Sequence, residues 1–259
     1  MPTFIVWQPK RSSVTRTERH DVIVVGGGVA GLSAAIFTAR QDLDTVVLTT
    51  GESRLRRNAH LENYPGFPAG VDARTLLEMM ADQAERAGSA IEEAEVTQLD
   101  PEADLLAVTT DDETIRRSDA VVAATKNRVD YLEHLDDVEV VHRGTSFVDV
   151  DGRGRTGLEG LYVAGRLAGK PHQAIVAAGH GAEVAVTLLE DADRGFYHDW
   201  VVPTGYFTGR GRDVPPGCEA IDDEERLRRV DRATACMREY VDASHSEPPE
   251  QHPEVRTDR

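Results

Sequence analysis

The stretch Asp21-Val22-Ile23-Val24-Val25-Gly26-Gly27-Gly28-Val29-Ala30-Gly31-Leu32-Ser33-Ala34-Ala35 decides the fold of this chain. Four β-branched apolar residues run into three glycines, and an alanine-rich pattern with helical spacing follows. A strand, a tight turn and a helix in this order open a doubly wound α/β domain. The sequence therefore predicts a strand over residues 21–25, a helix over residues 31–41 and a second strand over residues 45–50.

Three glycines in this stretch have separate expected roles in binding a dinucleotide. Gly26 permits the sharp turn, Gly28 lets the backbone approach a pyrophosphate, and Gly31 lets the helix pack closely on the strand. The phosphates would meet free N–H groups and the positive end of the helix dipole. The alternative is a tight turn in an unrelated α/β domain.

The end of the second strand departs from the usual dinucleotide pattern. An acidic residue is expected there to bind a ribose hydroxyl, but Thr49, Thr50 and Gly51 occupy the position, and Glu52 is the nearest carboxylate. This weakens a generic NAD interpretation and leaves FAD or NAD(P) open.

The composition excludes several classes of partner. The 259 residues carry a net charge of −17, from 46 acidic and 29 basic residues. Such a chain repels phosphates, which argues against a nucleic-acid partner. No run approaches the ~20 apolar residues of a membrane span, and residues 1–20 lack a signal-peptide pattern. We therefore expect a cytoplasmic protein with no membrane contact, whose acidic surface suits a high-salt cytosol.

Cys218 and Cys236 are the only cysteines, and no Cys-x-x-Cys occurs. The chain therefore lacks a redox dithiol at that spacing and a zinc ribbon, and no metal site is predicted. Plain packing residues are the favoured interpretation of the two cysteines, and a disulfide or redox pair is the alternative.

The sequence predicts a three-layer Rossmann-like α/β domain with a parallel sheet and a small antiparallel meander, followed by a C-terminal extension. Residues 1–20 are expected to form an arm, 21–190 the domain, 191–243 an aromatic segment and helix, and 244–259 a disordered tail. Meander strands are expected over 91–99, 105–110 and 113–117, and further strands over 119–124, 138–142 and 161–165. Helices are expected over 72–87, 129–135, 172–190 and 222–241.

Two parts of this pattern carry narrower expectations. A second G-x-G-x-x-G, at Gly152, Gly154 and Gly157, lacks a following apolar helix and is interpreted as a solvated turn. In the extension, aromatic residues are expected to fix an extended segment to the domain or to a partner subunit. The last helix is expected to turn five of its residues inward, toward the rest of the protein. The aromatic residues are Phe196, Tyr197, Trp200, Tyr206 and Phe207, and the five helix residues are Leu227, Val230, Cys236, Met237 and Tyr240.

Four stretches together resemble thioredoxin reductase, in the pyridine nucleotide–disulfide oxidoreductase group. They are Val24 to Ala35, Leu61-Glu62-Asn63-Tyr64-Pro65-Gly66-Phe67-Pro68, Arg155 to Gly165, and Gln173 to Ala182. The resemblance covers about residues 21–190 and implies an FAD-binding domain. Members of this family can end the second strand in Thr-Gly, which softens the missing acidic residue.

The resemblance also implies residue roles. The glycine-rich turn would hold the FAD pyrophosphate, Glu52 would lie near the adenosine ribose, and Asn63 beside the isoalloxazine. Val96 would touch the adenine through its backbone, and Thr125 would lie along the cofactor. The residues assigned to the cofactor are Gly26, Gly27, Gly28, Ala30, Gly31, Glu52, Asn63, Val96, Thr125, Gly165, Arg166, Gln173 and Ala174. No catalytic acid or base is fixed by the sequence, although His60, His172 and His180 lie near these motifs.

Two departures from the family bear on mechanism. Only about 30 residues separate Thr125 from Arg155, too few for a second doubly wound domain, so the family's NAD(P)H domain with its Cys-x-x-Cys is absent there. Arg166 follows Gly165 where the family has Asp, and it would pair with a flavin phosphate, bind an anionic substrate or face solvent.

We therefore expect an FAD-dependent oxidoreductase that receives electrons from a protein such as ferredoxin, a small thiol or a diffusing nicotinamide. The alternatives are a non-catalytic flavin-binding or interaction protein and an NAD(P)-binding oxidoreductase. A homodimer is an open alternative for its assembly.

Overall fold

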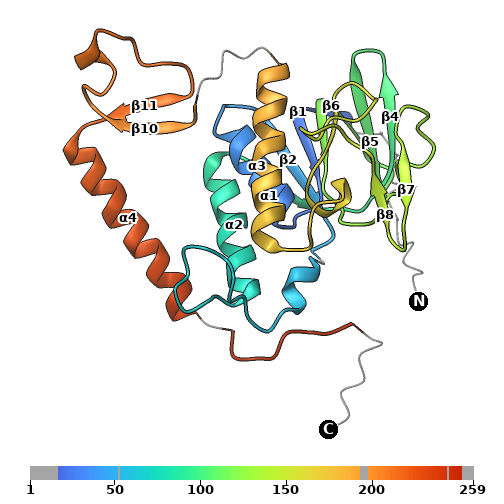
Figure 1. Cartoon of the computed structure of the whole chain (residues 1–259), viewed down its shortest axis with the longest axis horizontal. Coiled ribbons are helices and arrows are strands. Elements are labelled where there is room, and N and C mark those ends of the chain that lie inside the picture. Colours follow the sequence, from blue (N-terminus) through green and yellow to red (C-terminus); the bar gives the residue numbers. More distant parts are fainter. Residues whose placement is uncertain (1–16, 52, 193–197, 244, 253–259) are drawn as a thin grey trace, which may run out of the picture.

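A computed structural model describes residues 17–51, 53–192, 198–243 and 245–252 (Figure 1). Its seven-stranded sheet has the order β3-β2-β1-β6-β5-β4, with β9 also paired to β6. The parallel strands are β1 (Thr17–Val25), β2 (Thr45–Thr49), β3 (Ala90–Glu93), β6 (Ile115–Ala123) and β9 (Leu161–Val163). The antiparallel strands β4 (Val96–Glu102) and β5 (Leu105–Thr110) form the meander with β6. The predicted fold class is confirmed.

The strand β1 separates two apolar cores because its side chains alternate between the faces of the sheet. Val22 and Val24 pack into the core beneath the helices. Ile23 and Val25 pack into the core under the meander and residues 129–148. Helices α1 (Val29–Ala39), α2 (Ala73–Ala87) and α3 (Ala174–Asp191) cover the first face, so the domain has three layers.

The ends of α2 follow from its sequence. Asp72 caps the first turn by accepting hydrogen bonds from the backbone N–H groups of Arg74 and Thr75. Gly88 ends the helix in the left-handed conformation, with φ of +113°. These two residues account for the bounds of the predicted helix, and its apolar residues at helical spacing are buried: Leu76, Leu77, Met80 and Ala84.

Three parts of the predicted pattern are wrong. Residues 113–117 and 119–124, predicted as separate strands, belong to the single strand β6. Residues 91–99 do not form one strand. The strand β3, which pairs with β2, ends at Glu93, and the next residue, Ala94, donates its N–H to the Thr49 carbonyl of β2. The chain then turns into the meander at Glu95, whose N–H donates to the Asp111 carboxylate. Residues 129–135 form successive turns instead of a helix. Their apolar side chains are buried under the sheet, and this packing takes the place of a regular helical ladder.

The segment between β6 and β9 carries only a small hairpin. Its strands are β7 (Val140–His142) and β8 (Ser146–Val148), which pair antiparallel. The second G-x-G-x-x-G follows and leads into β9 without opening a helix, as expected. The turn is not fully solvated, because Gly154 is buried and an added Cβ there would lie 2.5 Å from the Val184 side chain.

The C-terminal extension projects from the domain (Figure 1). It comprises the parallel pair β10 (Trp200–Pro203) and β11 (Cys218–Ile221), the short helix η3 (Thr208–Arg210) and helix α4 (Asp223–Asp242). Trp200, Tyr206 and Phe207 contact one another edge-on, whereas the predicted contributors Phe196 and Tyr197 lie outside the described residues.

The prediction that α4 turns an apolar face inward is wrong. No residue of α4 is buried in the described chain, and Leu227 and Val230 are 53% and 50% exposed. Met237 is also exposed, while Cys236 and Tyr240 are only partly covered. The amphipathic pattern is present, but no other element of the described chain buries this face.

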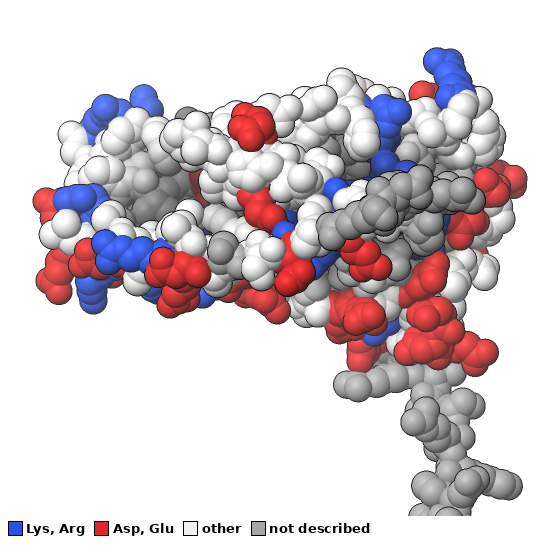
Figure 2. All heavy atoms as spheres, turned by 90° about the horizontal axis from the view of Figure 1, so that it is seen from below, with Lys and Arg blue, Asp and Glu red and all other residues white. Residues whose placement is uncertain are grey.

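The molecular surface is acidic. Figure 2 shows Asp and Glu side chains gathered toward the right-hand end of the face seen from below. Across the described ranges, no helix is both long and apolar enough to cross a membrane.

Candidate functional site

The turn between β1 and α1 is shaped by two glycines that serve the fold itself. Gly26 has φ of +113°, and a Cβ there would lie 2.7 Å from the Ala124 carbonyl oxygen. A Cβ on Gly31 would lie 1.9 Å from the Gly26 carbonyl oxygen. Side chains at these positions would force the backbone of the turn to move.

Gly28 is different, because the protein leaves room for a side chain there. Its φ is −86°, which any residue adopts, and the nearest atom to an added Cβ is the Ser53 hydroxyl at 3.7 Å. Gly28 caps α1 without any side-chain hydrogen bond to the first turn, and no acidic residue occupies that turn. The helix therefore presents uncapped N–H groups beside an open glycine, as an anion-binding helix terminus requires.

The turn opens into a cleft of about 1120 Å³ at the carboxyl ends of the parallel strands. Most residues assigned to the cofactor line this cleft: Gly26, Gly27, Gly28, Ala30, Asn63, Val96, Thr125, Arg166, Gln173 and Ala174. Gly31 and Gly165 lie behind it in the contacts between elements, and Glu52 is outside the described residues. The structure thus brings together segments that are far apart in the chain.

Close packing of α3 on α1 closes one side of the cleft. A Cβ on Gly181 would lie 2.0 Å from the Ala30 carbonyl oxygen, and one on Gly165 would lie 2.7 Å from the Ala30 Cβ. The small residues of α3 therefore permit a close approach of its backbone to that of α1. At the mouth, the side-chain amide of Asn63 donates to the side-chain oxygen of Gln173 at 2.9 Å.

Thr125 lines the cleft, but its hydroxyl is engaged within the protein. It donates to the Arg128 carbonyl at 2.7 Å and lies 3.0 Å from the hydroxyl of Tyr131. Burial raises the pKa of Tyr131, which keeps this phenol protonated. Tyr131 was not predicted as a neighbour of the site, since a tyrosine in a short apolar run is not distinctive.

The three candidate histidines have different surroundings. His180 is buried, and its Nδ1 accepts the N–H of Gly165 at 2.9 Å. Burial lowers its pKa and favours the neutral ring that this bond requires. His60 and His172 line the cleft, and His60 pairs with Glu62 at 2.7 Å.

Lys126 lines the cleft, although the sequence had led us to assign it no role in binding the cofactor. It has φ of +65°, in the left-handed region. Burial, followed by the charges of Arg54, Arg166 and Arg57, lowers its pKa to about 8. The available signal was its position directly after Thr125, in a chain with few lysines.

The two cysteines lie outside the cleft and are free thiols. Cys218 is on β11 and Cys236 on α4, so the alternative of a disulfide is not supported. Among the described residues, no group of His, Cys, Asp and Glu is arranged to hold a metal ion.

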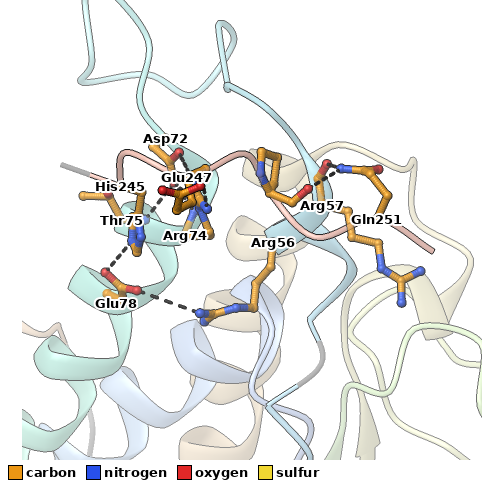
Figure 3. Close-up of polar contacts among 10 residues, drawn as sticks. Arg56, Arg57, Asp72, Arg74, Thr75, Glu78, His245, Glu247 and Gln251 are labelled. Atoms are coloured by element: carbon orange, nitrogen blue, oxygen red, sulfur yellow. Dashed lines mark hydrogen bonds and ion pairs between the residues drawn. The ribbon is translucent and has the colours of Figure 1, made fainter. Parts of the chain in front are cut away.

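Residues 245–251 run beside the short helix η1 (Arg54–Arg57) and the start of α2 (Figure 3). His245 contacts Glu78 at 3.1 Å, and Gln251 donates to the Arg57 carbonyl at 2.9 Å. Because Arg54 and Leu55 of η1 line the cleft, this segment supports one wall from outside.

A family model described as an FAD binding domain matches residues 21–61. The domain is Rossmann-like, and its glycine-rich turn with the uncapped end of α1 lies within the segment that is similar to an FAD binding domain. FAD is the cofactor that the match and the similar proteins indicate.

The chain resembles thioredoxin reductases. It is 33% identical over 129 residues to the bifunctional thioredoxin reductase/thioredoxin of Mycobacterium leprae, covering 49% of this chain and 28% of that protein. It is 35% identical over 109 residues to the thioredoxin reductase of Streptomyces clavuligerus, covering 41% of this chain and 34% of that protein. The chain thus spans well under two thirds of these relatives.

Solved structures show the same fold. A thioredoxin reductase from Gloeobacter violaceus superimposes with a TM-score of 0.63 at 21% identity, covering 68% of this chain and 96% of that one. A ferredoxin-flavin thioredoxin reductase from Clostridium acetobutylicum gives a TM-score of 0.56 at 17% identity, covering 69% and 100%.

Proposed function

We propose that this chain is an FAD-dependent oxidoreductase whose bound flavin is reduced by a donor other than a nicotinamide domain inserted in the chain. The observation that carries the proposal is the open Gly28 at the uncapped end of α1, facing a cleft of about 1120 Å³. The backbone needs no glycine there for its own packing, which supports a ligand that approaches it closely.

Different residues of the cleft would bind different parts of FAD. The first turn of α1, from Gly28 to Ala30, would bind the pyrophosphate through backbone N–H groups. Val96 and Thr125 would line the adenosine side. The hydrogen-bonded pair Asn63 and Gln173 would fix the orientation of the ring system, with Ala174 beside it. FAD, when bound, supplies the electron transfer, and the protein supplies binding, orientation and electrostatics.

The source of electrons is constrained by the segment between β6 and β9. Residues 124–160 hold only β7 and β8, so no nucleotide-binding domain is inserted there. Neither cysteine lines the cleft, which leaves no internal dithiol beside the flavin. These features favour an external donor, such as ferredoxin, a small thiol or a diffusing nicotinamide. The same features favour, as the alternative, a flavin-binding protein without catalysis.

Absorbance and anaerobic reduction separate these functions. We expect the purified protein to be yellow, or to become yellow with added FAD, and to retain the flavin through gel filtration. Anaerobic mixing with NADPH, NADH, a dithiol and reduced ferredoxin would then bleach the flavin with at least one donor. Retained flavin that no physiological donor reduces would support the non-catalytic alternative, and failure to bind FAD would refute both.

A further inference from the structure

Positive charge converges on the cleft from three separate elements. Arg54 lies on η1 after β2, Lys126 follows β6, and Arg166 lies on the short helix η2 (Gly165–Ala168) after β9. All three line the same cleft, and we name them the cationic cluster. They meet because the carboxyl ends of parallel strands share one edge of the sheet.

The cationic cluster has no carboxylate partner within the described part of the chain. Elsewhere in this acidic protein arginines pair readily, as Arg155 does with Asp191 at 2.6 Å. Arg166 instead lies over the ring of Phe147 at 4.7 Å and donates to a backbone carbonyl.

The described carboxylates of the cleft wall already contact other side chains. Glu62 pairs with His60 at 2.7 Å, and Glu95 pairs with Arg128 at 2.6 Å. Neither forms an ion pair with the cationic cluster, so the described residues of the wall supply no compensating anion for its like charges.

The conformation of Lys126 adds an independent observation. A lysine in the left-handed region is strained relative to glycine, and such strain is retained mainly where the side chain has a use. The lowered pKa of Lys126 reflects its burial and the neighbouring arginines, so like charges are held close together here. An anion in the cleft would relieve this repulsion.

The pyrophosphate of FAD accounts for only part of this charge. It is a dianion with a seat at the uncapped turn of α1, where N–H groups and the helix dipole stabilise it. Three cations remain, and Arg57 lies near enough to affect Lys126. The total positive charge of these side chains exceeds the negative charge of one pyrophosphate.

We propose that the cationic cluster is a second anion-binding subsite of the cleft, which binds the dianionic phosphate of a phosphorylated small molecule next to FAD. This inference rests on the proposed function, because it assumes that FAD occupies the turn. Two guanidinium groups and an ammonium match a phosphomonoester in charge and in hydrogen-bond donors. The ligand is an electron donor or acceptor that carries such a group.

Calorimetric titration of the FAD-loaded protein at low salt tests the subsite. Ribose 5-phosphate is the organic probe, ribose is its neutral control, and inorganic phosphate tests whether the free ion suffices. We expect saturable binding of ribose 5-phosphate that weakens with added NaCl. Arg166→Gln and Lys126→Gly should each weaken it by roughly ten-fold or more. The exposed Arg212→Gln, with the same charge change far from the cleft, should change it by less than about two-fold.

Lys126→Gly also guards against a folding artefact. Because glycine adopts the left-handed conformation without strain, this variant should unfold at a Tm no lower than that of the parent while still losing affinity. Absent binding of every phosphate probe, or equal affinity in the two cleft variants and the parent, would overturn the proposal. Release of FAD by both variants would also overturn it, by assigning the cluster to the cofactor.

The proposed function and the subsite fail separately. If the protein held no FAD, the proposed function would be wrong. The same titration of the FAD-free protein would then still decide whether Arg166 and Lys126 bind phosphate.

Discussion

Replacing Gly28 with alanine isolates the role of the glycine-rich turn. The added Cβ meets no protein atom closer than 3.7 Å, and the backbone conformation suits alanine. The free energy of unfolding of the FAD-free protein should therefore change by less than about 1 kcal/mol. The new methyl group projects where a phosphate must approach the backbone N–H groups to ~2.9 Å.

The expected loss of FAD affinity follows from those hydrogen bonds. One bond to a charged group, worth about 1.5–3 kcal/mol, would be lost or lengthened. The Kd for FAD should rise by about 10- to 100-fold. Titration followed by flavin fluorescence measures this Kd, and urea denaturation without FAD measures stability.

Gly31→Ala is the matched comparison, because it adds the same single carbon to the same turn. Its Cβ would lie 1.9 Å from the Gly26 carbonyl oxygen, so the helix must shift, at a cost of about 1–3 kcal/mol or more. This variant should lose stability even without FAD. A Gly28→Ala protein that binds FAD as tightly as the parent would refute the placement of the phosphates at Gly28.

Three further predictions concern the stability of the protein and the segment packed beside the cleft. Asp72→Ala should lower the free energy of unfolding by about 1 kcal/mol. The Arg74 guanidinium and the backbone N–H bonds lower the pKa of Asp72 to about 2. Urea titrations should therefore show the full difference in stability from the parent above pH ~4, and a smaller one towards pH ~2. Glu78→Gln weakens contacts to His245 and Arg56, so amide exchange over residues 245–251 should quicken while stability changes by less than ~1 kcal/mol; unchanged exchange would contradict the docking of this segment. The Tm should rise from low to molar KCl because salt screens the net charge of −17, and an equal Tm would remove the case for a high-salt cytosol.

The parts of the fold with a short-range cause could be predicted from the sequence. The run from Val22 to Gly31 carries its own strand, turn and helix signals, and Asp72 and Gly88 mark the ends of α2. The break at Ala94 could not be predicted, because it depends on a hydrogen bond to Thr49 from a different strand.

The candidate site was predictable only where a motif named its residues. Asn63 and Gln173 lie 110 residues apart, and the resemblance placed both beside the flavin. Lys126 and Arg54 belong to no motif. Their role in the cleft could be recognised only in the structure, where the ends of three strands bring their charges close to that of Arg166. The exposure of Leu227 on α4 was likewise beyond prediction, since a helical pattern does not say which surface will bury its apolar face.

The close packing of α1 against α3 has a consequence for folding of the domain during its synthesis. Ala30 leaves the ribosome early, yet its partner Gly181 emerges only after nearly the whole sheet has been synthesised. Until then the alanine-rich side of α1 has no helix to cover it, so a nascent chain carries an exposed apolar surface. Contacts of such long sequence separation form slowly. The cleft, one side of which α3 closes, is therefore among the last features of the domain to assemble.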